Sequence, residues 1–328
     1  MVKYTIKRII YMIFVFFVMS ILLFFLYNKI PGDRAMQEVF PMRERLTPEQ
    51  FQRLYEQTRM EMGLDDPLVT RYQKWITQVL KLNLGMSERQ HRPVIDVVIP
   101  PMKITIFINI FAIILALGIT IPLGIRTAVR KDSTFDRTVQ VLTIVGYSIP
   151  TFIVALMFIY IFAVKLRWFP VSGMNTANFT GTGWAWFKDT MHHLALPLTI
   201  MTVTSLAGIT RYVRAAMADA LSMDYIKTAR AKGLSEKSVI YSHAWRNALL
   251  PVITLIIGWI MSIFSGTFII ESMFSINGMG RLYIDSLNFK DFNVVLAIQM
   301  FYVIIGLVGN LIVDLSYGIV DPRVRIDG

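Results

Sequence analysis

Few side chains in this sequence have the types and the spacing that catalysis or metal binding requires. The four histidines are His91, His192, His193 and His243, and none of them belongs to an H-E-x-x-H pair. His192 and His193 are adjacent, so on a helix their side chains would point about 100° apart and would not readily share one metal ion. The chain also has no cysteine, which excludes disulfides, thiolate metal sites and a cysteine nucleophile. The sequence therefore predicts no catalytic residue and no metal site.

Two glycine-containing segments match a catalytic or nucleotide-binding motif only in part. Gly146-Tyr-Ser148-Ile-Pro150 has the outline of a nucleophile elbow, but it ends in proline inside an apolar run, which favours a helix kink. Gly278-Met-Gly280 lacks the third glycine of a dinucleotide-binding loop and follows no predicted strand. No G-x-x-x-x-G-K-[ST] segment occurs in the chain. We therefore expect this chain to bind no nucleotide through a P-loop.

The polar residues within or beside the apolar runs are the remaining candidates for function. Glu271 ends the fifth run, and an acid at such a position is either a gate residue or a structural one; both interpretations stay open. Asp314 follows the sixth run, four residues after Asn310, and structural pairing is its favoured role. Ser148 and Pro150 join Glu271 as candidate gate or pathway residues, because prolines in membrane helices mark kinks and cavity linings, although ordinary helix packing also explains them.

Membrane helices must position these residues, because the composition places the chain in a membrane. The 328 residues are 55% hydrophobic and 17% charged, with a mean hydropathy of +0.54. Such a composition is typical of a polytopic membrane protein and excludes a soluble globule. The net charge of +11 would suggest nucleic acid in a soluble protein. Here the basic residues lie beside apolar runs, so membrane lipid is the expected partner and nucleic acid is not.

Six charge-free runs are long enough to cross the roughly 30 Å hydrocarbon core. A charge at the centre of a span costs about 2.5–3.5 kcal/mol on the insertion scale, so six such runs do not arise by chance. The first run follows basic residues as a signal peptide does, but its length and the lack of an A-x-A-like site predict an uncleaved helix. The predicted spans are Ile9–Asn28, Ile104–Ile125, Thr138–Val164, Thr190–Thr210, Asn247–Ile270 and Phe292–Val313.

The distribution of lysine and arginine predicts how these spans are oriented. With the N-terminus inside, the inner segments hold 16 basic residues and the short outer loops hold 5. The long segment 29–103 holds 12, but 10 acids nearly balance it, and long loops cross the membrane largely regardless of charge. We therefore expect both termini in the cytoplasm. Residues 1–28 form the N-terminal segment and first span, 29–103 an extracytoplasmic subdomain, and 104–328 a five-helix core.

The extracytoplasmic subdomain contains two predicted helices. The first covers Pro48–Met62 after the candidate cap Thr47, and the second covers Pro67–Leu82; glycine follows both. Tyr72 and Trp75 on the second helix are expected to lie against the outer membrane interface. Caps and apolar spacing favour a folded cap over a solvated spacer.

The segment 222–233, inside the predicted cytoplasmic region 211–250, has every signal of a short helix. Ser222 is the expected N-cap, and Asp224 places negative charge in the first turn. Arg230 and Lys232 place positive charge in the last turn, and Gly233 stands where the backbone must turn left-handed. So many agreeing signals favour a helix that docks another protein.

One face of this short helix is predicted to make that contact. Tyr225, Ile226 and Ala229 share a face at helical spacing, and Leu234 is expected to fold back on the last turn. Ala229, Ala231 and the following glycine are small enough to let a partner approach closely. We therefore expect the partner to dock on this face.

The run from Asp224 to Ser235, followed by His243-Ala-Trp-Arg-Asn-Ala-Leu-Leu-Pro251, resembles the cytoplasmic coupling segment of binding-protein-dependent ABC importer permeases. More narrowly, it resembles the first, B-type, permease of the oligopeptide, dipeptide and nickel class. The resemblance covers nearly the whole chain, and its specificity lies in the order and spacing of several short motifs. The other matching motifs are Pro31-Gly32-Asp33, the run from Gly63 to Tyr72, Leu84-Gly85-Met-Ser87, Arg92-Pro93-Val94, Asp136-Arg137 and Asp321-Pro322-Arg323.

The chain departs from that family at four places. Lys227-Thr228-Ala229 stands where the general family has Glu-Ala-Ala, and the peptide class often departs from Glu-Ala-Ala there as well, which supports the subclass. Three prolines usual in the class are replaced by Arg34, Asn277 and Asn293, all on the predicted external side. The family's outer gate is therefore not carried over in detail.

The resemblance implies an all-α fold of six transmembrane helices, the type I importer permease fold, in the cell membrane. It implies that the chain is no enzyme and binds no cofactor, that it forms half of the pathway with a second permease, and that two cytoplasmic ATPases bind ATP and Mg²⁺. An external binding protein would deliver oligopeptides or dipeptides. The implied ATPase-coupling residues are Asp224, Tyr225, Thr228, Ala229, Arg230, Ala231, Lys232, Gly233 and Leu234.

Three other functions were weighed against peptide import by an ABC permease. Nickel or another small solute is the alternative cargo within the same class. An ion-coupled secondary transporter would need charge pairs deep in the spans or an inverted repeat, and the spans show neither. A membrane scaffold or receptor would leave the proline- and glycine-interrupted spans unexplained.

Overall fold

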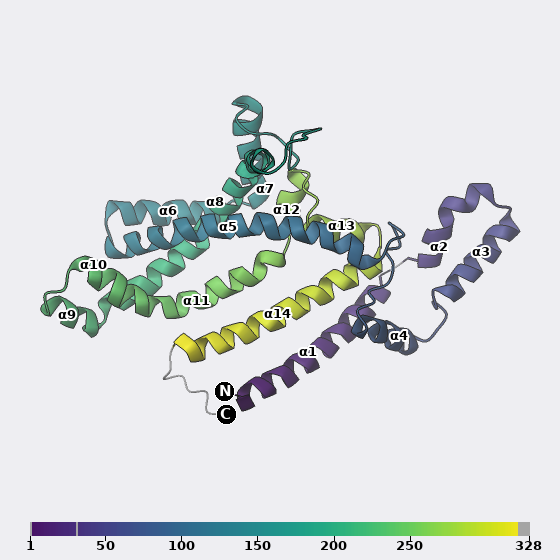
Figure 1. The fold of residues 1–328 in the computed structure, drawn as a ribbon, viewed down its shortest axis with the longest axis horizontal. Coiled ribbons are helices and arrows are strands. Elements are labelled where there is room, and N and C mark those ends of the chain that lie inside the picture. Colours follow the sequence, from purple (N-terminus) through teal and green to yellow (C-terminus); the bar gives the residue numbers. More distant parts are fainter. Residues whose placement is uncertain (1, 31, 321–328) are drawn as a thin grey trace. The chain divides into compact units, whose positions relative to one another are not determined.

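The protein is built almost entirely of helices (Figure 1). The structure is a computed structural model that describes residues 2–30 and 32–320. Within those residues the extended backbone forms a single isolated antiparallel bridge, between Met86 and Pro93, and no strand. The all-α fold predicted from the sequence is confirmed.

Four helices are each long and apolar enough to cross a membrane. They are α1 (Val2–Asn28), α5 (Val94–Val129), α8 (Trp184–Ser222) and α14 (Phe292–Val320). Two bent pairs of helices bring the possible number of crossings to six within the described residues. Five of the six predicted spans fall on these helices and bent pairs, the fifth span extends beyond its bent pair, and the four long helices extend beyond the charge-free runs.

The third predicted span, Thr138–Val164, is not one helix. α6 (Thr134–Ser148) and α7 (Thr151–Phe158), which continues into the π-helix η2 (Ile159–Lys165), are bent by 101°. Pro150 lacks an amide hydrogen and pushes the preceding Ile149 out of the helical region, to a ψ of 124°. The predicted kink at this proline is therefore confirmed, and it is sharp enough to separate two helices.

The fifth predicted span, Asn247–Ile270, is also wrong as a single helix. α11 (Arg246–Met261) is followed by a 3₁₀ turn, η4 (Ser262–Phe264), and then by extended backbone before α12 (Phe268–Met273). The side-chain amide of Asn109, on α5, donates to the carbonyl oxygens of Ile263 at 2.9 Å and Ser265 at 3.0 Å. These bonds satisfy carbonyls at the end of the helix that have no helical partner.

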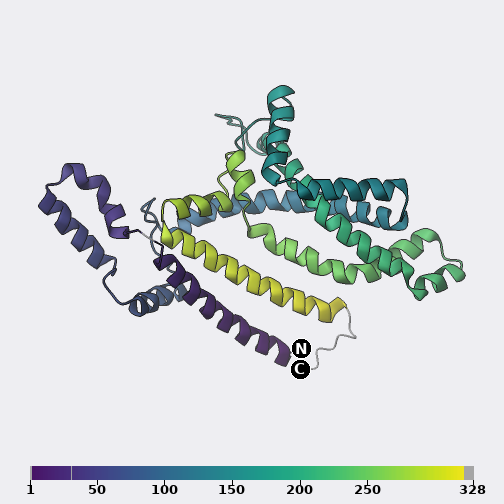
Figure 2. The same ribbon diagram turned by 180° about the vertical axis from the view of Figure 1, so that it is seen from behind.

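Contacts divide the chain into two compact units. Unit 1 comprises residues 1–101 and 282–307, and unit 2 comprises residues 102–281 and 308–327, each as far as the structure describes it. In unit 1 the end of α1 packs against the first turns of α14 (Figure 2), where Phe24 and Tyr27 are buried with Phe292, Val295 and Leu296.

The predicted helices of unit 1 are present, with one addition. α3 (Pro48–Glu61) begins after Thr47, the predicted cap, which forms a reciprocal capping box with Gln50, and α4 (Leu68–Leu80) follows. A short helix, α2 (Arg34–Val39), and a 3₁₀ segment, η1 (Phe40–Arg45), precede them and were not predicted. Tyr72 and Trp75 pack on Phe24 of α1, with ring centroids 5.6 and 5.3 Å away.

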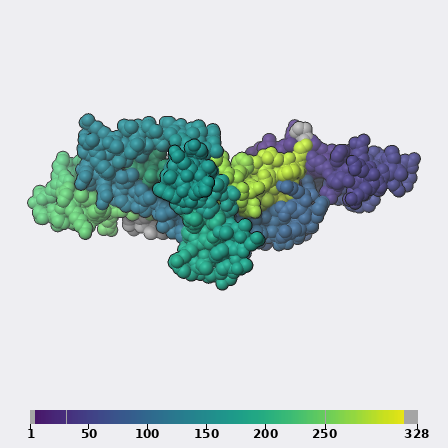
Figure 3. All heavy atoms as spheres, turned by 90° about the horizontal axis from the view of Figure 1, so that it is seen from above, coloured from purple at the N-terminus to yellow at the C-terminus, as the bar shows by residue number. Residues whose placement is uncertain are grey.

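Unit 2 has two buried apolar clusters. One gathers Leu194, Leu196 and Ile200 of α8 with Ile270 and Phe274 around α12. The other lies at the opposite end of α8 and includes residues of α9 (Asp224–Ala231) and of the π-helix η3 (Val239–Trp245), which follows α10 (Glu236–Ser238). In the space-filling view, the teal segment that leads from α7 into α8 projects from the rest of this unit (Figure 3).

Candidate functional site

The short helix α9 forms where the sequence predicts it, but its first turn is arranged differently. α8 runs to Ser222, and Met223 is the extended N-cap residue, with φ −74° and ψ 152°. Ser222 was predicted to be the cap and is not, because its hydroxyl donates back to the carbonyl of Asp219 at 2.7 Å. Asp224 does lie in the first turn, where its charge favours the helix dipole.

The C-terminal end of α9 confirms the predicted left-handed stop. Gly233 has φ +75°, and its amide donates to the carbonyl of Arg230 at 2.9 Å. The amide of Leu234 donates to the carbonyl of Ala229 at 3.3 Å. These two bonds form a Schellman motif, which fixes the direction in which the chain leaves the helix.

The buried face of α9 points into unit 2 and leaves less surface for a partner than predicted. Ile226 and Ala229 are buried among Val239, Ala244 and other residues of the same chain. Ala229 was predicted to receive a partner and instead packs internally. Tyr225 lies at the edge of that face with 39% of its surface exposed.

The exposed face of α9 is partly committed to ion pairs within the chain. The guanidinium of Arg230 donates to Glu236 on α10 at 2.6 Å, and this bond holds the pKa of Glu236 below its usual range. Lys227 pairs with Asp224 at 2.8 Å. These charged residues therefore form ion pairs within the chain. A stripe of exposed residues outside the ion pairs remains, which consists of Tyr225, Thr228, Ala231 and Lys232.

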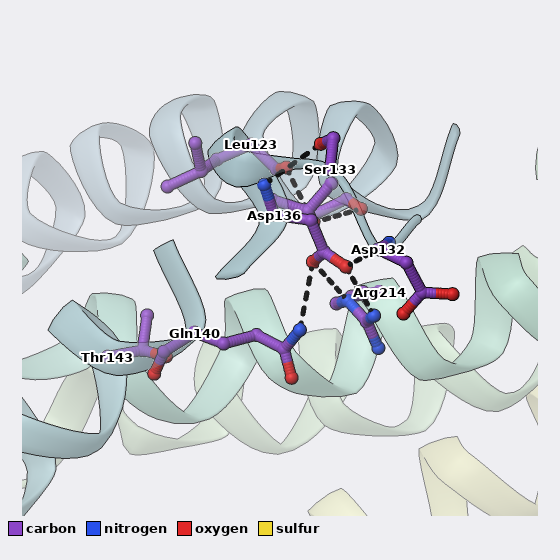
Figure 4. A network of polar contacts seen from close by, with 9 residues as sticks. Leu123, Asp132, Ser133, Asp136, Gln140, Thr143 and Arg214 are labelled. Atoms are coloured by element: carbon purple, nitrogen blue, oxygen red, sulfur yellow. Dashed lines mark hydrogen bonds and ion pairs between the residues drawn. The ribbon is translucent and has the colours of Figure 1, made fainter. Parts of the chain in front are cut away.

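A buried ion pair joins α6 to α8 within unit 2. Asp136, in the first turn of α6, is fully buried and accepts two bonds of 2.6 Å from Arg214 on α8 (Figure 4). The side-chain amide of Gln140 and the backbone amide of Asp132 donate to the same carboxylate, at 3.1 and 3.0 Å. Sequence reasoning noted Asp136 only as part of a motif and missed Arg214.

The candidate gate residues Ser148 and Pro150 lie at the break between α6 and α7. Both are exposed, and the hydroxyl of Ser148 donates to the carbonyl of Ile144 at 2.9 Å within its own helix. Both residues therefore shape the bend, and a role for either in the pathway stays a prediction.

Glu271 lies at a different place, in a cradle of backbone groups at the start of α13 (Met279–Asn288). Its carboxylate accepts from the backbone amides of Arg281 at 2.8 Å and Thr267 at 3.3 Å. The hydroxyl of Thr105 on α5 donates to it at 3.1 Å and accepts from the amide of Met279 at 2.8 Å. Burial raises the pKa of Glu271, and these donors act in the opposite direction.

This geometry makes Glu271 a remote cap for α13. The first amides of a helix have no partner within the helix, and Glu271 and Thr105 supply acceptors for those of Met279 and Arg281. A Cβ atom at Gly278, Gly280 or Gly266 would overlap the carboxylate or the backbone around it. The structural role that the sequence left open is thus present in the contacts, and gating stays a prediction.

The histidines are held by backbone groups. His192 lies 3.0 Å from the carbonyl oxygen of Trp168, and His193 lies 2.9 Å from that of Asp189. Across the part of the chain that the structure describes, no group of three or more histidine and acidic residues is arranged to hold a metal ion.

Comparison with known proteins gives matches along the whole chain. A model of the family described as "Binding-protein-dependent transport system inner membrane component" matches residues 120–326, and one for the N-terminal part of such membrane components matches residues 1–109. The chain is 37% identical over 326 residues to the oligopeptide transport system permease protein AppB of Bacillus subtilis, covering 99% of this chain and 100% of that protein.

Two further relatives have similar names. A protein of Brucella suis named as a peptide permease is 33% identical over 327 residues, which is 99% of this chain and 100% of that protein. A protein of Sinorhizobium fredii named as a peptide ABC transporter permease is 32% identical over 326 residues, covering 98% of this chain and 99% of that protein.

Proposed function

This chain belongs to the family of binding-protein-dependent transport system inner membrane components, and we propose that it is the membrane-spanning permease of an ABC importer for oligopeptides or dipeptides. The observation that carries this function is the full-length match to relatives named as oligopeptide or peptide permeases. The helical fold, with four to six candidate crossings among the described residues, agrees with it.

The energy for transport comes from partner subunits in this proposal. Reversing a conformational equilibrium from 1:99 to 99:1 requires about 5.5 kcal/mol of differential binding. The sequence contains no P-loop motif through which the chain could bind ATP. Two cytoplasmic ATPases that bind ATP and Mg²⁺ would supply this free energy, and a second permease would complete the pathway as a heterodimer.

α9 is the proposed contact with one ATPase. Its inner face is anchored by Ile226 and Ala229, and its C-terminal end is fixed by the Arg230–Glu236 pair and the Schellman turn at Gly233. A helix fixed in this way can transmit a push or pull to α8 and η3, which share its apolar cluster. The stripe of Tyr225, Thr228, Ala231 and Lys232 would contact the ATPase.

The orientation and external partner follow from the same proposal. The N- and C-termini and α9 would lie in the cytoplasm, and most of unit 1 outside α1 and α14 would lie on the external side of the cell membrane. An external binding protein would deliver the cargo there. Peptide is favoured over nickel because the relatives are named as oligopeptide or peptide permeases. The described residues also include no group of three or more histidine and acidic residues that could hold a metal ion.

The proposal is tested by isolating the chain with its partners from native membranes in a mild detergent. We expect mass spectrometry to identify a second permease and two P-loop ATPases. The binding protein of that system should then bind peptides in a titration and not nickel. Recovery of this chain alone in several detergents would contradict the proposal and favour a self-sufficient transporter.

A further inference from the structure

Three cavities in unit 1 share one wall residue, Arg34. Their volumes are about 450, 170 and 410 Å³. Arg34 is the first residue of α2, and Arg71 of α4 lines the first two cavities with it. The largest cavity falls in the size range of small-molecule sites, which is about 300–1,000 Å³.

The guanidinium of Arg34 is buried and incompletely satisfied. Its side chain is only 17% exposed, and its Nη2 atom has no hydrogen-bond partner. It lies over the ring of Phe292 at 4.2 Å, and its carboxylate partner, Glu88, is 3.9 Å away. An orphaned donor on a buried charge is unfavourable unless an anion supplies the missing acceptor.

Arg71 adds a second positive charge to the same walls. Its Nη2 atom donates to the side-chain oxygen of Asn28 at 2.6 Å. Asn28 is neutral, so this bond does not neutralise the charge of Arg71. Burial holds the pKa of Arg34 below its usual range against the attraction of Glu88, and repulsion between the two arginines adds to the lowering. An anion between them would relieve both effects.

The acids around these cavities are already engaged or lie at their edges. Asp66 is bonded to Lys74 at 2.6 Å, and Asp33 to Arg59 at 3.1 Å. Glu61 is exposed and accepts from Gln57 on its own helix. Burial raises the pKa of Glu88 to about 7, so its charge is only partly present near neutral pH. None of these acids replaces an external anion beside Arg34 and Arg71.

We propose that unit 1 contains a binding site for the carboxylate of a small solute, with Arg34 and Arg71 as its anchors. Guanidinium groups bind carboxylates through paired hydrogen bonds, which suits two arginines that face one cavity. Trp75 and Leu84 provide apolar wall for the rest of the solute. The site does not depend on the proposed transport function.

Asn293 lines the two larger cavities together with Arg34. The side-chain amide of Asn293 donates to the carbonyl of Met86 at 2.9 Å, which joins the start of α14 to the loop at the cavity wall.

The test is a titration of the purified full-length chain, by calorimetry, with trialanine, trialanine amide and Asp-Ala-Ala amide. The first probe has a C-terminal carboxylate, the second has none, and the third has only a side-chain carboxylate. We expect the first or third to bind and the second to bind at least about tenfold more weakly, because hydrogen bonds to a charged group are lost. The probe that binds more tightly shows whether the site takes a C-terminal carboxylate or a side-chain carboxylate.

Variants separate the site from non-specific attraction. Arg34→Gln and Arg71→Gln should each weaken carboxylate binding by about tenfold or more, and Arg71→Gln serves if the more buried variant fails to fold. Arg53→Gln removes the same charge from an exposed position on α3 and should leave binding unchanged. Equal binding of the amide, no binding of either carboxylate probe, or full binding by Arg71→Gln would overturn the proposal.

Discussion

The carboxylate of Glu271 occupies the space that a Cβ atom at Gly278 would need. Gly278→Ala should therefore force the cradle apart and destabilise the protein by about 1–3 kcal/mol, the usual cost of overpacking. Thermal unfolding of the purified protein measures the change. Gly258→Ala is the matched control, because nothing lies within 4 Å of its new methyl group. Equal stability of the two variants would contradict the cradle.

Glu271→Gln should separate the two roles left open for this residue. The amide nitrogen of glutamine cannot accept a hydrogen bond, so one of the amides of Thr267 or Arg281 would lose its acceptor, at a cost of about 1–3 kcal/mol. If Glu271 gates the pathway, peptide uptake should fall in membranes where the variant is present at wild-type abundance. Unchanged uptake per molecule would leave Glu271 with its capping role alone.

Asp136→Asn should be more damaging than a typical surface change. It leaves the guanidinium of Arg214 partly buried without its charge partner, which costs about 3–5 kcal/mol for a buried pair. Arg137→Gln, which changes the exposed neighbour, should cost under about 0.5 kcal/mol. Unfolding of both variants in detergent checks the comparison, and similar losses for the two would argue against the pair as a support of α6 and α8.

Local signals explain why some elements were predicted from the sequence. The capping box at Thr47 and the left-handed turn at Gly233 depend on residues within a few positions of each other, and both are present. The break at Pro150 is local in the same way, because proline acts on its own residue and the one before it.

Long-range partners explain what the sequence did not reveal. Beyond α11, the carbonyls of Ile263 and Ser265 in the non-α-helical segment accept from Asn109, more than 150 residues away in the chain. Arg214 reaches Asp136 across 78 residues, and Ala229 packs inward on η3. Ser222 fails as a cap because α8 continues to that residue, and no local signal marks that continuation. Contacts of this kind are fixed by tertiary packing.

Glu88 should give the protein a dependence of stability on pH. Burial raises its folded-state pKa from the ordinary value of 4.5 to about 7. The folded chain therefore holds this proton more tightly than the unfolded chain, so the contribution of Glu88 to stability is fully present below pH 4.5 and is lost as the pH rises through about 7. The loss is on the order of 3 kcal/mol.

Glu88→Gln tests this dependence because it removes the titrating group and keeps its shape. The difference in unfolding temperature between pH 5 and pH 8 should shrink in this variant. Glu49→Gln changes an exposed acid of the same unit and should keep the wild-type difference. An unaltered difference in Glu88→Gln would mean that another group produces the pH dependence.

Gly233→Val should uncouple transport from ATP hydrolysis while the chain still inserts in the membrane. The backbone at Gly233 has φ +75°, where β-branched residues are strained by about 1–3 kcal/mol, and no neighbouring atom lies within 4 Å of a new Cβ. The effect is thus one of backbone conformation, and Gly233→Asn is the matched control, because asparagine tolerates the left-handed region. In the assembled complex, the valine variant should lose peptide uptake and peptide-dependent ATPase activity, and the asparagine variant should keep most of both. A distorted Schellman turn can no longer direct the chain from α9 into α10. Wild-type uptake by the valine variant would therefore mean that α9 does not couple ATP hydrolysis to transport.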